Sequence, residues 1–128
     1  MTGPEAPPTA PAALEAASDL LERLLLQVTT VPGQAVRTAL VREMRRAARQ
    51  VARLREGSLD ESETFTQLRT AQACVERLRL RLEQLGESAA PLAATAAVVG
   101  EALTRHRREA ITQAVAGEAA GSTPPESD

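Results

Sequence analysis

The stretch from Gln34 to Glu56 constrains the fold most, because two sets of residues repeat in it with the period of an α-helix. At about 100° per residue, apolar side chains fall on one side of such a helix and arginines fall on the opposite side. The apolar set comprises Val36, Leu40, Met44, Ala47, Val51 and Leu54. The arginine set comprises Arg42, Arg46, Arg49 and Arg53. The stretch is therefore predicted to form one long helix with a core stripe and an arginine stripe on its back.

Three further segments have the same amphipathic spacing. They are expected at about Ala12 to Thr29, from about Asp60 to Leu85, and at about Ala89 to Ala116. Aromatic residues make up only 1% of the chain, so the core must be built from Leu, Val and Ala, and the residues typical of strands are missing. We therefore predict an all-α fold, an antiparallel up-down-up-down four-helix bundle over residues 12–116. A heptad coiled coil is the weaker alternative, because breaker sites interrupt the pattern.

The connections between these segments carry helix stop and start signals. The stop signals are Pro32-Gly33, Gly57 and Gly86. The third helix has two possible capping boxes, Ser58 with Glu61 and Asp60 with Glu63, so its first residue stays open.

The two ends of the chain differ in character from the body. Residues 1–11 are rich in proline and residues 117–128 are acidic, and both are expected to be disordered. The ends at 1–33 and 114–128 each carry a net charge of −3, whereas 34–113 carries +4, which sums to the overall −2. Every basic residue is arginine, a side chain that offers planar, bidentate contacts to phosphate or carboxylate.

No recognisable catalytic or metal-binding pattern occurs in the sequence. The phosphate-loop, dinucleotide, serine-hydrolase and HExxH motifs are all missing. His106 and Cys74 are the single histidine and the single cysteine, so they form neither a ligand set nor an intrachain disulfide. A di-metal carboxylate bundle would need Glu-x-x-His pairs, and there are none. We expect a structural or interfacial histidine, a buried thiol, no metal, no cofactor and no enzymatic activity.

The sequence also lacks membrane and export signals. No apolar run approaches about 18 residues, and no basic segment precedes an apolar one at the start. We expect a cytoplasmic protein with no membrane association.

Arginines on three of the predicted helices are the candidate binding residues. They are Arg42, Arg46, Arg49, Arg53, Arg77, Arg81, Arg105 and Arg108. A surface made of them would attract a nucleic-acid backbone with a salt-sensitive affinity. The alternative is a solvated face offset by nearby acids such as Glu43, Glu76, Glu83 and Glu109. Because stacking aromatics are missing, recognition would rest on shape and phosphate groups rather than on unstacked bases.

Some apolar residues fall outside the main stripes and suggest self-association. They are Val41, Leu80, Val98 and Ile111. A small body with alanine-rich stripes buries only a modest core, so an oligomer would cover these side chains. The alternative is that they are scattered surface residues, which are common.

Two runs and their order along the chain resemble a known family. These are TTVPGQAVRTALVREMRRAARQVARLREG and LRTAQACVERLRLRLEQLG, followed by a final amphipathic helix. The layout resembles the four-helix-bundle accessory proteins of diversity-generating retroelements, called accessory variability determinants or Avd proteins. It is also similar to the four-helix proteins encoded in ribosomal-RNA intervening sequences. The resemblance covers about residues 14–113.

The resemblance implies a non-catalytic accessory protein. Avd proteins form pentamers of four-helix protomers and associate with a reverse transcriptase and its template RNA to support mutagenic reverse transcription. Carried over, the arginines of the second and third helices would contact the RNA or the polymerase, and the chain would be a homo-oligomer. It departs from the pattern in its acidic ends and its lack of lysine. The alternative is a structural helical-bundle protein that mediates protein–protein assembly only, without nucleic-acid binding.

Overall fold

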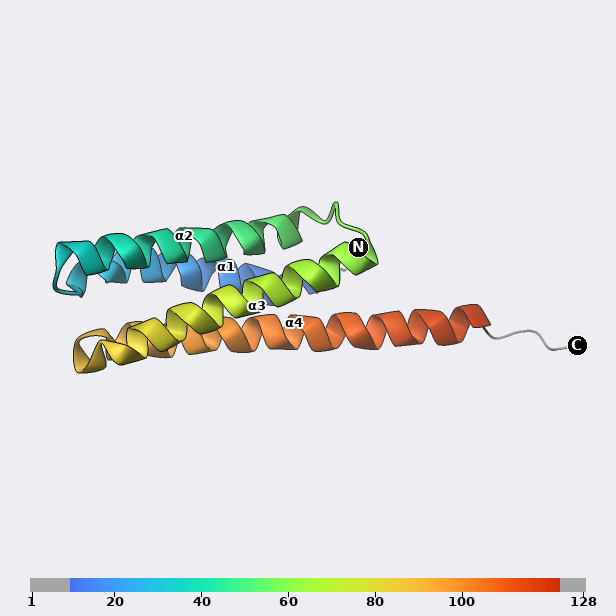
Figure 1. Ribbon diagram of the computed structural model, residues 1–128. Helices are drawn as coiled ribbons and strands as arrows, with labels where there is room; N and C mark the ends of the chain where they lie inside the picture. Colours follow the sequence, from blue (N-terminus) through green and yellow to red (C-terminus); the bar gives the residue numbers. More distant parts are fainter. Residues whose placement is uncertain (1–9, 123–128) are drawn as a thin grey trace, which may run out of the picture.

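Four helices make up the computed structural model, which describes residues 10–122, with side chains described for 12–117 (Figure 1). They are α1 (Ala10–Gln27), α2 (Gln34–Glu56), α3 (Glu61–Gln84) and α4 (Ala90–Ser122). Short 3₁₀ turns, Val28–Thr30 and Gly86–Ala89, follow α1 and α3. The described residues contain no strand. The predicted all-α four-helix bundle is confirmed.

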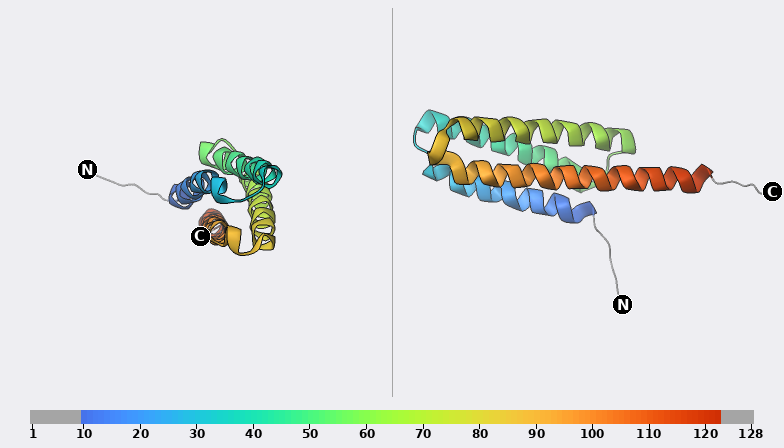
Figure 2. Two further views of the ribbon diagram at one scale, coloured as in Figure 1. Left: turned by 90° about the vertical axis from the view of Figure 1, so that its left-hand side faces the viewer. Right: turned by 90° about the horizontal axis from the view of Figure 1, so that it is seen from below.

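The helices run alternately up and down around a common core (Figure 2). Helix α1 packs beside α2 and α4, and α3 packs beside the same two helices. The helices α2 and α4 are therefore diagonal partners that meet chiefly through the core. This arrangement decides which surface residues of different helices can act together.

The core is built from the stripes that the helical period predicts. In α2 the buried residues are Leu40, Met44, Ala47, Val51 and Leu54. In the other helices they include Leu14, Ala17, Leu21 and Leu24, then Leu68, Ala71, Val75, Leu78 and Leu82, and finally Leu92, Ala96, Val99 and Leu103. Phe65, the single aromatic ring, is half-buried against this cluster. Small and aliphatic side chains thus supply the apolar burial that holds the bundle together.

Helix α2 has the bounds that its sequence predicts. Gly57 ends it in a left-handed conformation, with φ of 72°, and donates its backbone N–H to the Leu54 carbonyl at 3.3 Å. That conformation strains residues that carry a Cβ, which accounts for a glycine at this position.

The start of α3 resolves the choice between two capping boxes in favour of Asp60 and Glu63. The Glu63 backbone N–H donates to Asp60 Oδ1 at 2.7 Å, and the Asp60 N–H donates to Glu63 Oε1 at 3.0 Å. Both bonds satisfy backbone donors that a helix start otherwise leaves unpaired. The alternative box at Ser58 is not used, since Ser58 lies before the cap.

Two predicted boundaries were wrong. Helix α1 begins at Ala10 rather than Ala12, because proline is tolerated in the first turn of a helix and Pro11 lies there. Helix α4 continues through Gly117 to Ser122, so the predicted disorder from 117 is incorrect up to that residue. Glycine costs a helix about 1 kcal/mol relative to alanine, which the surrounding alanines offset. The rest of the predicted tails, 1–9 and 123–128, lies outside the described residues.

Candidate nucleic-acid interface

The four arginines of the α2 stripe are all exposed, and they lie on the side of the helix opposite its buried residues. These are Arg42, Arg46, Arg49 and Arg53. None of them forms a salt bridge or hydrogen bond with another residue of the described chain. Their guanidinium donors therefore face solvent.

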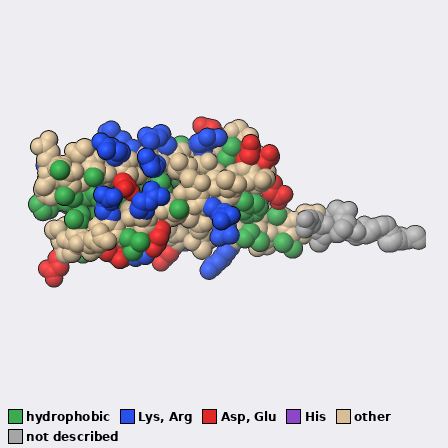
Figure 3. Space-filling view, in the orientation of Figure 1, with side chains coloured by type: hydrophobic (Ala, Val, Ile, Leu, Met, Phe, Trp, Pro, Cys, Tyr) green, Lys and Arg blue, Asp and Glu red, His purple; other side chains and the backbone are tan. Residues whose placement is uncertain are grey.

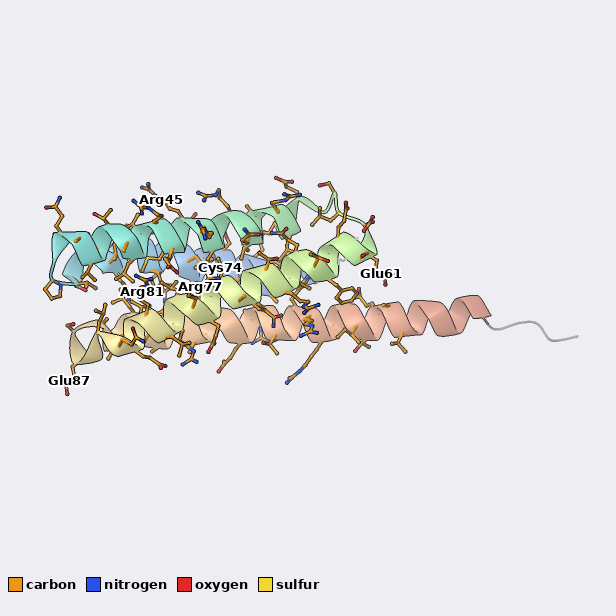
Figure 4. The ribbon with its side chains drawn as sticks, in the orientation of Figure 1. Arg45, Glu61, Cys74, Arg77, Arg81 and Glu87 are labelled. Atoms are coloured by element: carbon orange, nitrogen blue, oxygen red, sulfur yellow. The ribbon has the colours of Figure 1, made fainter. Side chains whose placement is uncertain are left out.

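Two exposed arginines of α3, Arg77 and Arg81, lie along the seam between α2 and α3 (Figure 4). Arginine side chains gather over α2 and along this seam in the space-filling view, with an acidic group between them (Figure 3). We call the four stripe arginines of α2, together with Arg77 and Arg81 of α3, the basic face. Its members are Arg42, Arg46, Arg49, Arg53, Arg77 and Arg81.

Glu43 is the acidic group at the seam. Its Oε2 lies 3.4 Å from Arg81 Nη2, and its side chain is only 19% exposed. An ion pair this close to solvent stabilises the fold by at most about 1 kcal/mol. The pair fixes the position of Arg81 and neutralises one charge, which leaves five arginines of the basic face without an acidic partner in the described chain.

Cys74 lies beneath the seam and is buried. Burial raises the pKa of its thiol, and the positive charges of Arg77 and Arg46 oppose that rise without overcoming it. Because the thiolate is the nucleophilic form, a buried thiol with a raised pKa is chemically inert. The residue acts as a small apolar group in the core.

The two predicted arginines of α4 are on a different surface. Arg105 and Arg108 are exposed and line a groove of about 660 Å³ between α3 and α4. Arg79, Glu76 and Glu101 line the same groove. Because α4 is diagonal to α2, the structure does not bring Arg105 and Arg108 together with the basic face.

Acids neutralise much of that second groove. Arg79 donates to both Glu76 and Glu83 along α3. The hydrogen bond from Arg79 lowers the pKa of the Glu76 carboxyl, and the same contact raises the pKa of Arg79. The α3–α4 groove therefore has mixed charge, whereas the basic face is almost uniformly positive.

A third surface, where the turn after α1 meets α2, was missed by the sequence reasoning. It is lined by Arg37 and Arg45 together with Arg42 and Arg49 of the predicted stripe. Arg45 projects from α2 away from α3 (Figure 4). The available signal was that Arg45 lies three residues after Arg42 and four before Arg49, which places all three on one side of a helix.

His106 is buried, with 6% of its surface exposed, in agreement with a structural role. It borders a shallow groove with Leu54 and Gly57. No group of three or more potential metal ligands occurs among the described residues.

Apolar residues remain exposed outside the basic face. Leu80, Val98 and Ile111 are exposed as predicted, Val41 is half-buried, and Leu26 and Val115 are exposed in addition. In the described part of the chain, no helix has the length and apolar character needed to cross a membrane.

Comparison with known proteins yields no relative. No protein family, no curated protein and no solved structure matches the chain.

Proposed function

We propose that the protein is a non-enzymatic adaptor that binds RNA on the basic face of α2 and α3. The observation that carries the proposal is the row of four exposed arginines on α2, none of them paired within the described chain. Arg77 and Arg81 extend this row onto the adjacent helix. Phosphate groups bind guanidinium forks through charge-assisted, bidentate hydrogen bonds, so such a surface suits a nucleic-acid backbone.

The chemistry of the face favours recognition of the backbone over recognition of bases. Phe65 is the single aromatic residue of the chain and is half-buried, so it offers no stacking platform beside the arginines. Folded RNA presents its phosphates at fixed positions, which a rigid helical scaffold can match by shape. We therefore propose structured RNA as the ligand.

The finer proposal follows from the resemblance to the Avd proteins. The RNA would be the template of a diversity-generating retroelement, and a reverse transcriptase would be the protein partner. The exposed apolar residues Leu80, Val98 and Ile111 support a homo-oligomer, since self-association would remove them from water. A homopentamer is the arrangement that the resemblance suggests.

The test is a double charge reversal at the seam. Arg46→Glu with Arg77→Glu lowers the net charge of the basic face by four, at the place where α2 and α3 meet. We expect the affinity for RNA to fall at least about tenfold. A matched control reverses two exposed arginines elsewhere, Arg23→Glu with Arg107→Glu. Fluorescence anisotropy with a labelled RNA hairpin measures both variants, and circular dichroism checks that both stay helical. An equal loss of affinity in the control would refute the assignment to this face.

A structural protein that serves only protein–protein assembly is the second candidate. Leu26, at 77% exposed, and Val115, at 59%, favour it, because a protein partner would remove these apolar side chains from water. This function predicts self-association or partner capture without RNA binding at any salt concentration. Sedimentation analysis with and without RNA separates the two candidates.

A further inference from the structure

A groove where the turn after α1 meets α2 is a second positively charged surface, distinct from the seam, and we call it the α1–α2 groove. It has a volume of about 630 Å³ and lies at the end of the bundle where α1 turns into α2. Its lining is Val28, Thr29, Gln34, Arg37, Thr38, Val41, Arg42, Arg45 and Arg49. Its size is within the range of sites that bind small molecules.

The charge of this lining sets it apart from the other large groove. Four of its nine residues are arginines and none is acidic. The α3–α4 groove has three arginines and two glutamates, and Arg79 there is already held by Glu76 and Glu83. Because no acidic side chain lines the α1–α2 groove, the anions that balance its arginines come from outside the described chain.

Some side chains that line the groove are already hydrogen-bonded within the protein, and others have donors that can bind a ligand. Arg37 Nη1 donates to the Val31 carbonyl at 2.8 Å, and the Thr29 hydroxyl donates to the Leu26 carbonyl at 3.2 Å. These two side chains hold the turn between the helices. Arg42, Arg45, Arg49 and the Thr38 hydroxyl make no such bond within the described residues, so they can donate to a ligand.

The available donors form a line. Thr38, Arg42, Arg45 and Arg49 follow one another by four, three and four residues, which keeps them on one side of α2 over about 16 Å. The half-buried Val41, beside the buried Val28, supplies a small apolar patch in the same groove. A row of guanidinium groups beside a small apolar patch matches a ligand that has several linked phosphate groups and a small apolar or sugar portion.

We propose that the α1–α2 groove binds a compact polyphosphate, held by Arg42, Arg45 and Arg49 with Thr38. The phosphates can belong to inorganic polyphosphate or to a nucleoside triphosphate, which share the same chemistry. The site has Arg42 and Arg49 in common with the basic face, but Arg45 belongs to the groove alone. Arg45 therefore provides a way to test the groove without changing the seam.

Isothermal titration calorimetry of the full chain with tripolyphosphate, ATP and inorganic phosphate, in about 150 mM salt, tests the proposal. We expect tripolyphosphate to bind at least about tenfold more tightly than inorganic phosphate, because its linked phosphate groups can bind several arginine side chains at once. Replacing one fork, in Arg45→Ala, should weaken tripolyphosphate binding about tenfold or more. Arg53→Ala is the control, since Arg53 is an exposed α2 arginine outside the groove, and it should leave binding unchanged.

Three results would overturn the proposal: no heat of binding up to millimolar tripolyphosphate, equal affinity for inorganic phosphate, or an equal loss in both variants. If ATP binds as tightly as tripolyphosphate, the phosphates alone are recognised. If ATP binds more tightly and Val41→Ala removes the difference, the groove takes the nucleoside as well. Either ATP result supports the site, and the two results distinguish inorganic polyphosphate from a nucleoside triphosphate as the ligand.

The groove and the basic face are separable in the same set of variants. Arg77→Glu with Arg81→Glu should weaken RNA binding and keep tripolyphosphate binding, because both residues lie on α3 and neither lines the groove. Arg45→Ala should do the reverse. If RNA binding fails in every protein while tripolyphosphate still requires Arg45, the proposed function fails and the groove assignment stands.

Discussion

Gly100→Ala should stabilise the bundle. Gly100 lies inside α4, and a Cβ built on it would meet Val75 Cγ1 at 3.9 Å, which is an ordinary van der Waals contact. The glycine is therefore not required by a close helix crossing, so alanine gains its full advantage in helix propensity, about 0.8–1.0 kcal/mol. For 128 residues, an unfolding entropy of about 2.1 cal/mol/K per residue turns 1 kcal/mol into a rise in Tm of about 4 °C.

Thermal unfolding followed by circular dichroism, together with urea unfolding, measures this change. Gly57→Ala is the matched comparison, because its Cβ also has space but its φ of 72° is left-handed. That variant should lose about 1 kcal/mol through backbone strain. A lower Tm for Gly100→Ala would contradict the reasoning, since it would mean that α3 and α4 approach more closely than their contact at Val75 indicates.

Three further predictions concern the cap, the thiol and the surface ion pairs. Asp60→Ala should cost about 1 kcal/mol in urea unfolding and Ser58→Ala almost nothing, because only Asp60 caps α3; equal effects would contradict the assigned start. Cys74 should react with a thiol reagent at pH 8 on the order of 100-fold more slowly in the folded protein than in the urea-unfolded protein. The reason is that burial raises the pKa of the thiol and blocks access of the reagent. Equal rates would refute the burial of Cys74. Because Arg79 lowers the pKa of Glu76, the ion pair stabilises the fold above the ordinary carboxyl range and stops doing so as the pH falls through the lowered value. Arg79→Gln should therefore be less stable than the parent protein at pH 7 and equal to it near pH 2, and a difference that persists in acid would contradict this origin.

The helical period was sufficient to predict the fold. In α2, except for the half-buried Val36, every apolar residue of the predicted stripe is buried, and the stop signals at Pro32-Gly33 and Gly57 predict both bounds. This works because a residue's angular position on its own helix depends only on spacing. Helix ends were harder, since Pro11 and Gly117 are compatible with a helix at those positions although both residues usually signal its limits.

The surfaces could be predicted only in part. Periodicity places an arginine on the outside of its helix but does not tell which neighbouring helix lies beside it. Arg105 and Arg108 line the α3–α4 groove because α4 packs beside α3 and is diagonal to α2, and Arg45 lines the α1–α2 groove because the turn after α1 lies on that side of α2. These relations depend on helix order around the core, which the spacing within one helix does not contain.

RNA affinity as a function of salt concentration tests the central claim most directly. If the six arginines of the basic face each meet a phosphate, the logarithm of the association constant should fall against the logarithm of salt concentration with a slope between about −4.2 and −5.4. Arg46→Glu with Arg77→Glu should make that slope clearly shallower. Absence of RNA binding at low salt, or a slope near zero in the unaltered protein, would contradict an account in which exposed arginines of α2 and α3 hold an RNA backbone.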